Sequence, residues 1–475
     1  MTDSEKNTGA GFRTLTEATR YLEGLINRER STDYEYVRLD LRPVEALLDA
    51  LGNPERALSV IHVAGSKGKG STCLMAESIL LALGERVGTF TSPHLVTWLE
   101  RFRIDGAWVS EADLVSAVNR IRPTVDALRE GPLETKPSFF DVTTAIAFLL
   151  FAEAGVDRAV IEVGLGGRLD STNSVLPAMT CITSIELEHT DKLGETEAEI
   201  AAEKAGIIKD STPLIVGRLR RDADRVVRAR AAERAAPIQV AGEQFWVEAD
   251  AESQDPMAFT YSTIEGLRWS GKLAVPGEIA RWNAALAITC IRALEVYPDA
   301  ELESAVQNGL SECILPGRME VLAHDPAVLI DAAHTGESAK ALARALPLLA
   351  SDGVEFLLSV SADKELDLLL EALLPLARRV WITRAEPTRS LDPKRLAARI
   401  RELDAELPLD VIEDPVEASR KARAGLAPGR LLCATGSVYL AGKVRSALAA
   451  EEFGEAKRVS GPQGDGSGAS AERES

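Results

Sequence analysis

Cysteine is scarce in this 475-residue chain and shows no pattern. None of the five cysteines belongs to a C-x-x-C pair, and such an odd, scattered set is typical of a reduced cytosolic protein. The opening stretch MTDSEKNTGAGF has no apolar core of the kind found in signal peptides. No apolar run reaches the length of about 18 residues that a membrane span needs. The sequence therefore predicts a cytoplasmic protein with no membrane partner.

Positive charge is also in short supply. The chain has 54 lysine and arginine residues against 73 aspartate and glutamate residues, which gives a formal net charge of −19. A nucleic-acid-binding protein needs clustered lysine and arginine, so we expect no nucleic-acid partner. A small anionic ligand stays compatible with this charge, because a few local cations and backbone N–H groups are enough to bind one.

What the chain does contain is an alternation of strand-like and helix-like segments. Runs of β-branched and apolar residues end in glycine or polar loops, as in LSVIHVAG (58–65) and DRAVIEVGLGG (157–167). Helical stretches such as STCLMAESILLALGE (71–85) separate them. This alternation predicts an α/β fold built on parallel sheets.

The same pattern predicts two domains. Proline and glycine interrupt it at LPGRME (315–320), and a smaller alternating unit follows. The predicted division is a disordered tail over 1–12, a large domain over 13–312, a linker over 313–323, a smaller domain over 324–455 and a second disordered tail over 456–475.

The stretch VAGSKGKGST (63–72) lies between a predicted strand and a predicted helix, where a phosphate-binding loop must lie. It departs from the strict pattern, because Gly70 follows Lys69 and the hydroxyl of Ser71 comes one place late. Glycines allow backbone amides to curl toward an anion, while a lysine reaches the outer phosphates and a hydroxyl meets Mg²⁺. Taken alone, the loop leaves a plain glycine-rich turn open as the alternative.

The loop resembles the ATP loop of the Mur ligase superfamily, Gly-Thr-Asn-Gly-Lys-Gly-Ser/Thr. In that register Lys69 is the phosphate lysine, and Lys67 replaces an asparagine. Within the superfamily the chain is most similar to the folylpolyglutamate synthase/dihydrofolate synthase family, through blocks that occur in the right order. These blocks are TSPHLVTWLERFRIDG (91–106), SFFDVTTAIAF (138–148), EVGLGGRLDSTN (162–173), SIELEHTDKLGETEAEIAAEKAGIIK (184–209), NAALA (283–287), LPGRME (315–320), IDAAHTGESA (330–339) and ATGSVYLAG (434–442).

This resemblance implies a fold and a reaction. The fold would be a large P-loop-type ATPase domain with a parallel sheet, followed by a smaller, Rossmann-like α/β C-terminal domain. In the reaction, ATP phosphorylates a carboxylate, the amine of L-glutamate attacks the acyl phosphate, and phosphate leaves. The implied carboxylate substrates are tetrahydrofolate, which would be polyglutamylated, and dihydropteroate. Because relatives are usually monomers, we expect a monomer whose partners are these small molecules.

The resemblance also assigns residues to ATP and to Mg²⁺, the latter at two sites. It implies metal contacts for Ser92, Glu162 and His189, although a single acid or histidine is by itself more often structural. It implies a carbamylated Lys204, a reaction that requires a depressed lysine pKa. The implied ATP contacts, drawn from both domains, are Gly65, Gly68, Lys69, Gly70, Ser71, Thr72, Asn283, Arg318 and Asp331. The implied catalytic set is Lys69, His189, Lys204 and His334.

The pteroate side rests on positions that line the folate site in the family. These are Ser138, Phe140, Leu169, Asp170 and Ser171. The alternative for the aromatic residue is that it belongs to the core at the start of a helix. An aromatic neighbour and a carboxylate suit a flat pterin ring.

Two departures from the family pattern qualify the resemblance. Asp40 and Pro43 stand where the family has the glycine and arginine of Leu-Gly-Leu-Glu-Arg, so the action on dihydropteroate has less support than polyglutamylation. His334-Thr335-Gly336 replaces the common bacterial His-Asn-Pro.

Two other functions remain open at this point. A cell-wall Mur ligase acting on a UDP-muramyl substrate would need a further domain before the loop, and only about 60 residues precede it, fewer than an average domain has. A nucleotide-binding regulator without ligase activity would leave Arg318 and Asp331 without a role.

Overall fold

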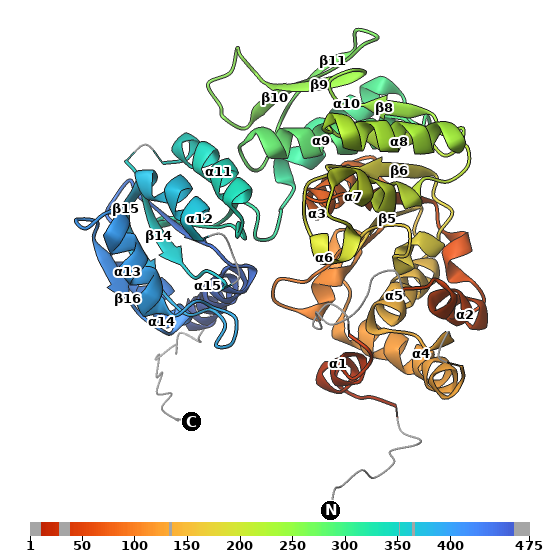
Figure 1. Cartoon of the computed structure of the whole chain (residues 1–475), viewed down its shortest axis with the longest axis horizontal. Helices are drawn as coiled ribbons and strands as arrows, with labels where there is room; N and C mark the ends of the chain where they lie inside the picture. Colours follow the sequence, from red (N-terminus) through yellow and green to blue (C-terminus); the bar gives the residue numbers. More distant parts are fainter. Residues whose placement is uncertain (1–10, 28–38, 133–134, 351, 363–365, 460–475) are drawn as a thin grey trace, which may run out of the picture. The chain divides into compact units, whose positions relative to one another are not determined.

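The structure is a computed structural model in which residues 11–27, 39–132, 135–350, 352–362 and 366–459 are described. The chain forms two compact units, Met1–Met319 and Glu320–Ser475, and the division falls inside the segment predicted as a linker. Both units contain a central sheet with helices packed on it (Figure 1). Within the described part of the chain, no helix combines the length and the apolarity that crossing a membrane requires.

Two sheets form the framework of the first unit. The strands are β1 (Val60–Ala64), β2 (Val87–Phe90), β3 (Phe102–Ile104), β4 (Ala107–Trp108), β5 (Arg158–Glu162), β6 (Met179–Ile182), β7 (Leu214–Val216), β8 (Ile238–Val240), β9 (Phe245–Ala249), β10 (Ala258–Thr263) and β11 (Arg268–Lys272). The larger sheet has the order β4-β3-β2-β5-β1-β6-β7-β8 and is parallel from β2 to β8. Strands β3 and β4 extend it in antiparallel fashion, and β11-β10-β9 form a separate antiparallel sheet.

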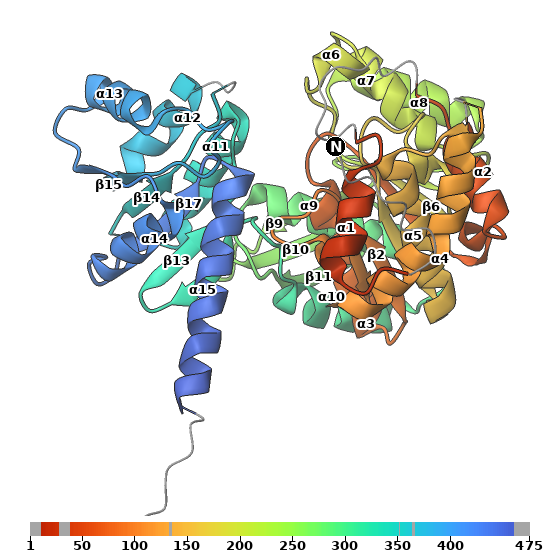
Figure 2. The ribbon, with the colours of Figure 1, turned by 90° about the horizontal axis from the view of Figure 1, so that it is seen from below.

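Helices cover both faces of the larger sheet (Figures 1 and 2). They are α1 (Leu15–Glu23), α2 (Arg42–Ala50), α3 (Lys69–Ala82), α4 (Glu111–Glu130), α5 (Phe139–Ala154), α6 (Thr190–Leu193), α7 (Glu197–Lys204), α8 (Arg221–Glu233), α9 (Glu278–Arg292) and α10 (Asp299–Glu312), with 3₁₀ turns η2 (Pro54–Ala57), η3 (Trp98–Arg101), η5 (Ser171–Ser174) and η6 (Ala205–Ile207). Helices α3, α9 and α10 pack together, α3 against β1, β2 and β5 and α9 against β6 and β7. Two apolar clusters lie on the other side, one with α1, α2, α4 and α5 and one with α7 and α8.

The loops that follow β1, β5 and β6 carry most of the predicted site. These strands are consecutive neighbours in the order β5-β1-β6, and all three are parallel. Their carboxyl ends therefore meet at one edge of the sheet, which is where open α/β sheets bind ligands. Every residue of β1 is buried, because both faces of a parallel sheet are covered.

The second unit has one mixed sheet. Its strands are β12 (Glu320–His324), β13 (Ala327–Ile330), β14 (Val354–Leu358), β15 (Ala377–Ile382), β16 (Leu409–Val411) and β17 (Leu431–Thr435), in the order β12-β13-β17-β14-β15-β16. Its helices are α11 (Gly336–Ala345), α12 (Leu366–Leu373), α13 (Pro393–Leu403), α14 (Pro415–Ala424) and α15 (Val438–Val459), with 3₁₀ turns η7 (Leu346–Leu348) and η8 (Leu374–Leu376). Helix α15 packs along β13 and β17 (Figure 2). Only β12 runs antiparallel to its neighbour.

The predicted fold class is confirmed, with some differences in detail. The short antiparallel strands β3, β4 and β12 give each sheet an edge that the sequence pattern did not indicate. Helix α15 continues to Val459 and so enters the segment predicted as a disordered tail. The other residues of the two predicted tails lie outside the described part of the chain, except for Gly11 and Phe12.

Candidate active site

The glycine-rich loop joins β1 to α3, and two of its positions need glycine because side chains of other segments pack directly against them. Gly68 caps α3 with a φ of 84°, in the left-handed region that favours glycine. A β-carbon on Gly68 would lie 2.4 Å from Oδ1 of Asn283, and one on Gly65 would lie 1.9 Å from Oγ1 of Thr183. The loop is therefore threaded between side chains from α9 and from the segment after β6.

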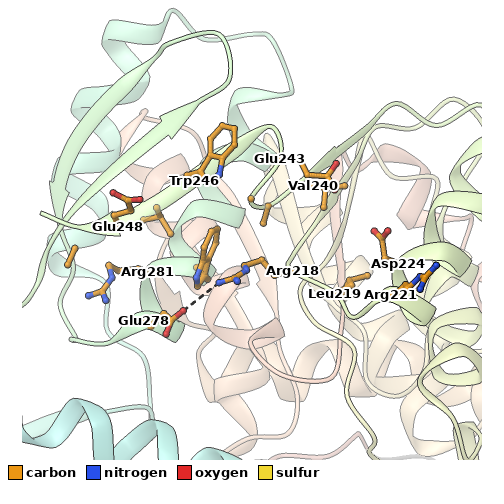
Figure 3. Close-up of a pocket in the computed structure, with 15 residues that line it drawn as sticks. Arg218, Leu219, Arg221, Asp224, Val240, Glu243, Trp246, Glu248, Glu278 and Arg281 are labelled. Carbon is orange, nitrogen blue, oxygen red and sulfur yellow. Dashed lines mark ion pairs between the residues drawn. The ribbon is translucent and has the colours of Figure 1, made fainter.

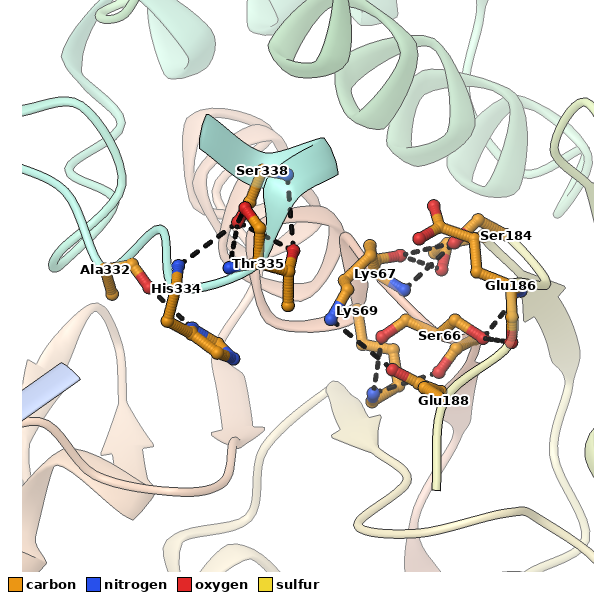
Figure 4. Close-up of polar contacts among 12 residues, drawn as sticks. Ser66, Lys67, Lys69, Ser184, Glu186, Glu188, Ala332, His334, Thr335 and Ser338 are labelled. Carbon is orange, nitrogen blue, oxygen red and sulfur yellow. Dashed lines mark hydrogen bonds and ion pairs between the residues drawn. The ribbon is translucent and has the colours of Figure 1, made fainter. Parts of the chain in front are cut away.

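Hydrogen bonds fix the loop to the segment that follows β6 (Figure 4). The Ser66 amide donates to the Ser184 carbonyl at 2.8 Å, and the Lys67 amide donates to Oγ of Ser184 at 2.9 Å. Oγ1 of Thr183 donates to the Lys67 carbonyl at 2.6 Å. These contacts hold the loop backbone in one conformation, with the first turn of α3 directly behind it.

Three lysine ammonium groups gather around this loop. Nζ of Lys69 folds back onto the Gly65 carbonyl at 2.9 Å, and Nζ of Lys204 donates to the same oxygen at 2.9 Å. The carboxylate of Glu188 forms ion pairs with two of these lysines, with Nζ of Lys204 at 3.3 Å and with Nζ of Lys67 at 3.5 Å. Three cations around one carboxylate leave a local positive charge, in spite of the acidic chain as a whole. Such a cluster at a helix N-terminus suits a polyphosphate.

Burial and charge shift the pKa values in this cluster. Lys204 is 1% exposed, and burial, reinforced by the charge of Lys69, lowers its pKa to about 8. Burial alone would raise the pKa of Glu188, but the charges of Lys204, Lys69 and Lys67 outweigh it and lower this pKa. The depressed lysine pKa that carbamylation requires is thus present in the structure.

The predicted metal ligands are only partly brought together. Glu162 ends β5 and is 5% exposed, and its Oε2 accepts the Ser92 amide at 2.9 Å. Burial raises the pKa of Glu162, against the charges of Lys69 and Arg318. His189 lies at the start of α6 with an exposed side chain, and among the described residues it makes no hydrogen bond or ion pair with Ser92 or Glu162.

The residues around the loop nevertheless fit a Mg²⁺ ion. Oγ1 of Thr72 is buried and has no hydrogen-bond partner among the residues that the structure describes. A β-carbon on Gly70 would lie 3.3 Å from Oε2 of Glu162, so this carboxylate opens directly onto the loop. Carboxylate and hydroxyl oxygens are the hard donors that Mg²⁺ takes. Within the described residues, no group of three or more histidine, cysteine, aspartate or glutamate side chains is arranged to hold a metal ion.

The predicted pteroate residues do converge. Asp141, one turn into α5, accepts from Oγ of Ser138 at 2.6 Å through one oxygen and from Oγ of Ser171 at 2.7 Å through the other. The ring of Phe140 lies against the loop after β5, because a β-carbon on Gly164 would be 2.5 Å from it. Asp170 caps η5 by accepting from Thr172.

Leu169, another of the predicted pteroate residues, is half-buried. Leu169 packs against the apolar cluster under α7 and α8. Asp141, which joins the two segments, was not singled out from the sequence, although it occupies the acidic position of the block SFFD.

Arg101 is the functional candidate that sequence reasoning missed most clearly. It is 1% exposed, although arginine rarely is. Its Nε donates to Nδ1 of His94 at 2.9 Å, and its guanidinium lies 5.2 Å from the ring centre of Trp98 and 5.5 Å from that of Phe139. The charge of Arg101 also lowers the pKa of Glu162, against the effect of burial. In the sequence it looks like one of several charged residues in WLERFR.

In the second unit, Asp331 and His334 follow β13 at the carboxyl edge of the sheet. The Ala333 amide donates to Oδ1 of Asp331 at 2.8 Å, and Nδ1 of His334 lies 2.8 Å from the Ala332 carbonyl. Thr335 then caps α11 through a capping box with Ser338 (Figure 4). The departure from the common family sequence at this point thus provides a helix cap.

A cavity elsewhere in the first unit contains none of the predicted residues (Figure 3). It has a volume of about 720 Å³ and lies among β9, the start of α8 and the start of α9. Some of its charged groups are paired with protein groups: Arg218 with Glu278 at 3.7 Å, and Asp224 and Glu243 with Arg228 at 2.8 and 2.6 Å. The lining also contains three further charged residues, Arg221, Glu248 and Arg281.

Comparison with known proteins agrees with this geometry. Residues 63–291 match the model of the Mur ligase middle domain, and residues 317–438 match that of the Mur ligase, glutamate ligase domain. The dihydrofolate synthase/folylpolyglutamate synthase of Bacillus subtilis (strain 168) is 32% identical over 415 residues, which is 87% of this chain and 95% of the relative. This chain belongs to the folylpolyglutamate synthase/dihydrofolate synthase family.

Further members of the family show the same similarity. The folylpolyglutamate synthase of Lacticaseibacillus casei is 30% identical over 91% of this chain and 98% of its own. The crystal structure of the Thermotoga maritima folylpolyglutamate synthase superposes with a TM-score of 0.81 at 31% identity, covering 92% of this chain and 97% of that one. The Mycobacterium tuberculosis folylpolyglutamate synthase complexed with ADP gives a TM-score of 0.80 at 32% identity, covering 91% of this chain and 98% of that one.

The predicted enzyme class is therefore confirmed. The chain is an ATP-dependent ligase of the folylpolyglutamate synthase/dihydrofolate synthase family, in preference to a cell-wall ligase or a regulator without ligase activity. Use of ATP agrees with the ADP complex of the related enzyme. The individual site residues stay predictions.

Proposed function

We propose that this protein adds L-glutamate to the carboxylate of tetrahydrofolate, and also of dihydropteroate, through an acyl phosphate formed from ATP. The observation that carries the proposal is the cluster of Lys67, Lys69 and Lys204 around Glu188 at the start of α3. The reaction must bring two anions together, a carboxylate and a triphosphate. Preorganised cations in a partly buried site are the main means by which proteins do so.

Lys69 is the phosphate lysine in this proposal. It needs only to leave the Gly65 and Ser66 carbonyls, at 2.9 and 3.4 Å, to reach an anion above the loop. The amides of Gly70 and Ser71 lie in the first turn of α3 and add their partial positive charge. Asn283, against Gly68, and Arg318, close enough to Glu162 to lower its pKa, are the further nucleotide contacts within the first unit.

Thr72, Glu162 and Ser92 would hold Mg²⁺, with His189 as the fourth candidate. When bound, the ion would supply positive charge to the phosphate oxygens, which favours phosphoryl transfer. The hydroxyl of Thr72 is buried without a partner, and the carboxylate of Glu162 faces the loop, so both are placed for this role.

Lys204 is the proposed site of carbamylation. Its amine would attack carbon dioxide, form a new N–C bond and release one proton, which gives an anionic carbamate. With a pKa of about 8, roughly a quarter of this amine is neutral at pH 7.5, against about a thousandth for an ordinary lysine. The carbamate would then be a second anion beside Lys67 and Lys69, and would orient the metal region.

The pterin end would lie against Phe140, Ser138, Asp170 and Ser171. An aromatic ring offers a stacking face to the flat pterin, and hydroxyl and carboxylate groups offer partners to its ring nitrogens. The shared carboxylate of Asp141 keeps the Ser138 and Ser171 segments in fixed register.

Asp331 and His334 of the second unit remain in the proposal as an ATP contact and a catalytic group. Both follow β13, and each side chain is hydrogen-bonded to a backbone group of the same loop, which limits its freedom. We also propose that the protein acts as a monomer with small-molecule substrates only.

The test is an assay of the purified full-length protein with ATP, Mg²⁺ and L-glutamate, and with tetrahydrofolate or dihydropteroate in separate reactions. We expect products heavier by one or more glutamate residues by mass spectrometry, and one ADP released for each residue added. ADP release without a glutamyl product, or activity on neither carboxylate, would refute the proposed function. Activity on tetrahydrofolate alone would restrict it to polyglutamylation.

A further inference from the structure

The side chain of a histidine in the middle of the central strand β1 makes a single hydrogen bond among the described residues, and that bond leads to the turn η5 after β5. His62 is fully buried. Because side chains alternate along a strand, it lies on the same face of β1 as Val60 and Ala64. Val60 packs in the apolar cluster that contains α5, and Ala64 packs in the one that contains α7. Its Nε2 lies 2.9 Å from Oγ1 of Thr172, in the turn η5.

The contact continues from Thr172 to Asp170. Oγ1 of Thr172 donates to Oδ1 of Asp170 at 2.5 Å, and the Thr172 amide donates to the same oxygen at 3.0 Å. The other oxygen, Oδ2, accepts the Leu165 amide at 2.9 Å. One carboxylate therefore ties together both ends of the loop between β5 and η5.

The direction of these hydrogen bonds follows from the number of protons available. A threonine hydroxyl has a single proton, and here it is given to Asp170. Oγ1 of Thr172 must then accept from His62, so the imidazole carries its proton on Nε2. Burial, reinforced by the charge of Lys209, lowers the pKa of His62 to about 3, so the ring stays neutral and does not exchange this role with pH.

The remaining nitrogen of the ring has no use in the fold. Nδ1 of His62 is buried and has no hydrogen-bond partner within the described part of the chain, which carries a free-energy cost that an apolar side chain would avoid. An apolar side chain would fill this position without that cost. The hydrogen bond from Nε2 to Thr172 therefore explains a histidine here better than packing does.

What it holds is the segment that carries Leu169, Asp170 and Ser171. Ser171 reaches Asp141 and so meets the start of α5. A shift of η5 would therefore move the proposed pterin contacts on both segments, while the glycine-rich loop, which follows β1, would keep its own hydrogen bond to Ser184.

We propose that His62 is a positioning residue for the folate substrate: through Thr172 and Asp170 it sets the conformation of the loop from Leu165 to Thr172 in which that substrate binds. This inference rests on the proposed function, since it takes this loop as the folate-binding loop. It predicts an effect on the folate or dihydropteroate substrate that ATP does not share.

The test compares His62→Leu, which removes the donor, with His62→Gln, whose side-chain amide can present an N–H at a similar reach. We expect His62→Leu to raise the KM for tetrahydrofolate about tenfold, the size of one lost hydrogen bond, with the KM for ATP changed less than about twofold. His62→Gln should return the KM for tetrahydrofolate to within about threefold of the parent protein.

Thr172→Val and Thr172→Ser repeat the test at the next link, with a smaller change to the core. Valine should behave as His62→Leu, and serine, which keeps the hydroxyl, as the parent. The double variant His62→Leu/Thr172→Val should be no worse than the poorer single variant, because both act through one chain of contacts. Thr144→Val is the matched control, since it removes another buried hydroxyl in this region that has no hydrogen-bond partner.

The outcomes separate the inference from the proposed function. If the parent protein acts on neither tetrahydrofolate nor dihydropteroate, the proposed function fails and takes the inference with it. If the parent is active and the donor-free variants at His62 and Thr172 keep a normal KM for the folate, the inference alone is overturned. Equal rises in the KM for ATP and for the folate, without recovery in the donor-retaining variants, would show a general structural role and would also overturn it.

Discussion

Replacing Lys69 by methionine should separate the two lysines of the glycine-rich loop most sharply. Nζ of Lys69 rests on the Gly65 and Ser66 carbonyls, within the loop itself, whereas Lys67 is 41% exposed and pairs with Glu188 at 3.5 Å. We therefore expect Lys69 to meet the transferring phosphate and Lys67 to remain at the rim.

The expected magnitudes differ by about two orders. Loss of a preorganised group that stabilises transition-state charge costs about 3–4 kcal/mol, so Lys69→Met should lower kcat about 10²–10³-fold. An exposed ion pair contributes about 0–1 kcal/mol, so Lys67→Met should change kcat about fivefold or less. The Gly65 carbonyl keeps its bond to Lys204 in both variants, so neither should unfold the loop.

The measurement is the initial rate of ADP release at saturating glutamate and folate, over a range of ATP concentrations. Thermal unfolding of both variants in the absence of nucleotide serves as the control for the fold. The assignment of Lys69 would be wrong if Lys67→Met abolished turnover while Lys69→Met left it near the parent rate.

Three further outcomes can be measured on the same protein. Glu162→Gln should raise the Mg²⁺ concentration needed for half-maximal ADP release at least about tenfold, because a neutral amide is a poorer ligand for this ion; an unchanged Mg²⁺ titration would place the ion elsewhere. Asp141→Asn should raise the KM for the folate but not for ATP, because an amide offers one acceptor atom to the hydroxyls of Ser138 and Ser171 where the carboxylate offers two; equal effects on both substrates would contradict this. The lowered pKa of Lys204 fixes the sign of its pH dependence. Between a pH of about 8 and its ordinary pKa of 10.5, the folded state binds fewer protons than the unfolded state. The contribution of this lysine to the free energy of unfolding therefore becomes more favourable as the pH rises through that interval. In urea unfolding at pH 7.5, 9 and 10, the free energy of unfolding should therefore rise more steeply with pH for the parent than for Lys204→Met. Equal dependence on pH in the two proteins would show that the lysine is not buried as described.

The sequence predicted the parallel core well because local rules decide it. Runs such as LSVIHVAG combine β-branched residues with a glycine stop, and a helix pattern follows at once, so β1 and α3 were both expected. The edge strands β3 and β4 span three and two residues, too few for any periodicity to show.

The site was predictable where residues adjoin in the sequence and not where the fold brings distant ones together. Lys69 follows from the resemblance of the loop to the ATP loop of the family, since those residues are consecutive in the chain. The crossing of Gly65 by Thr183, the buried stacking of Arg101 and the shared carboxylate of Glu188 depend on contacts between segments far apart in the chain. Hydrophobic periodicity contains no information about such contacts. His62 lies within the run LSVIHVAG, and nothing in that run distinguishes it from its strand neighbours.

The Gly65 carbonyl accepts from two ammonium groups, those of Lys69 and Lys204, and this redundancy has a consequence for turnover. If Lys69 moves to the nucleotide, as proposed, this oxygen is not left without a donor, because Nζ of Lys204 still donates to it. The loop can then release its mobile lysine in each catalytic cycle without a compensating backbone movement. Nucleotide binding and release would then need no change in the backbone of the glycine-rich loop. The rate of ADP release should therefore depend on the contacts of the nucleotide and not on a rearrangement of this loop.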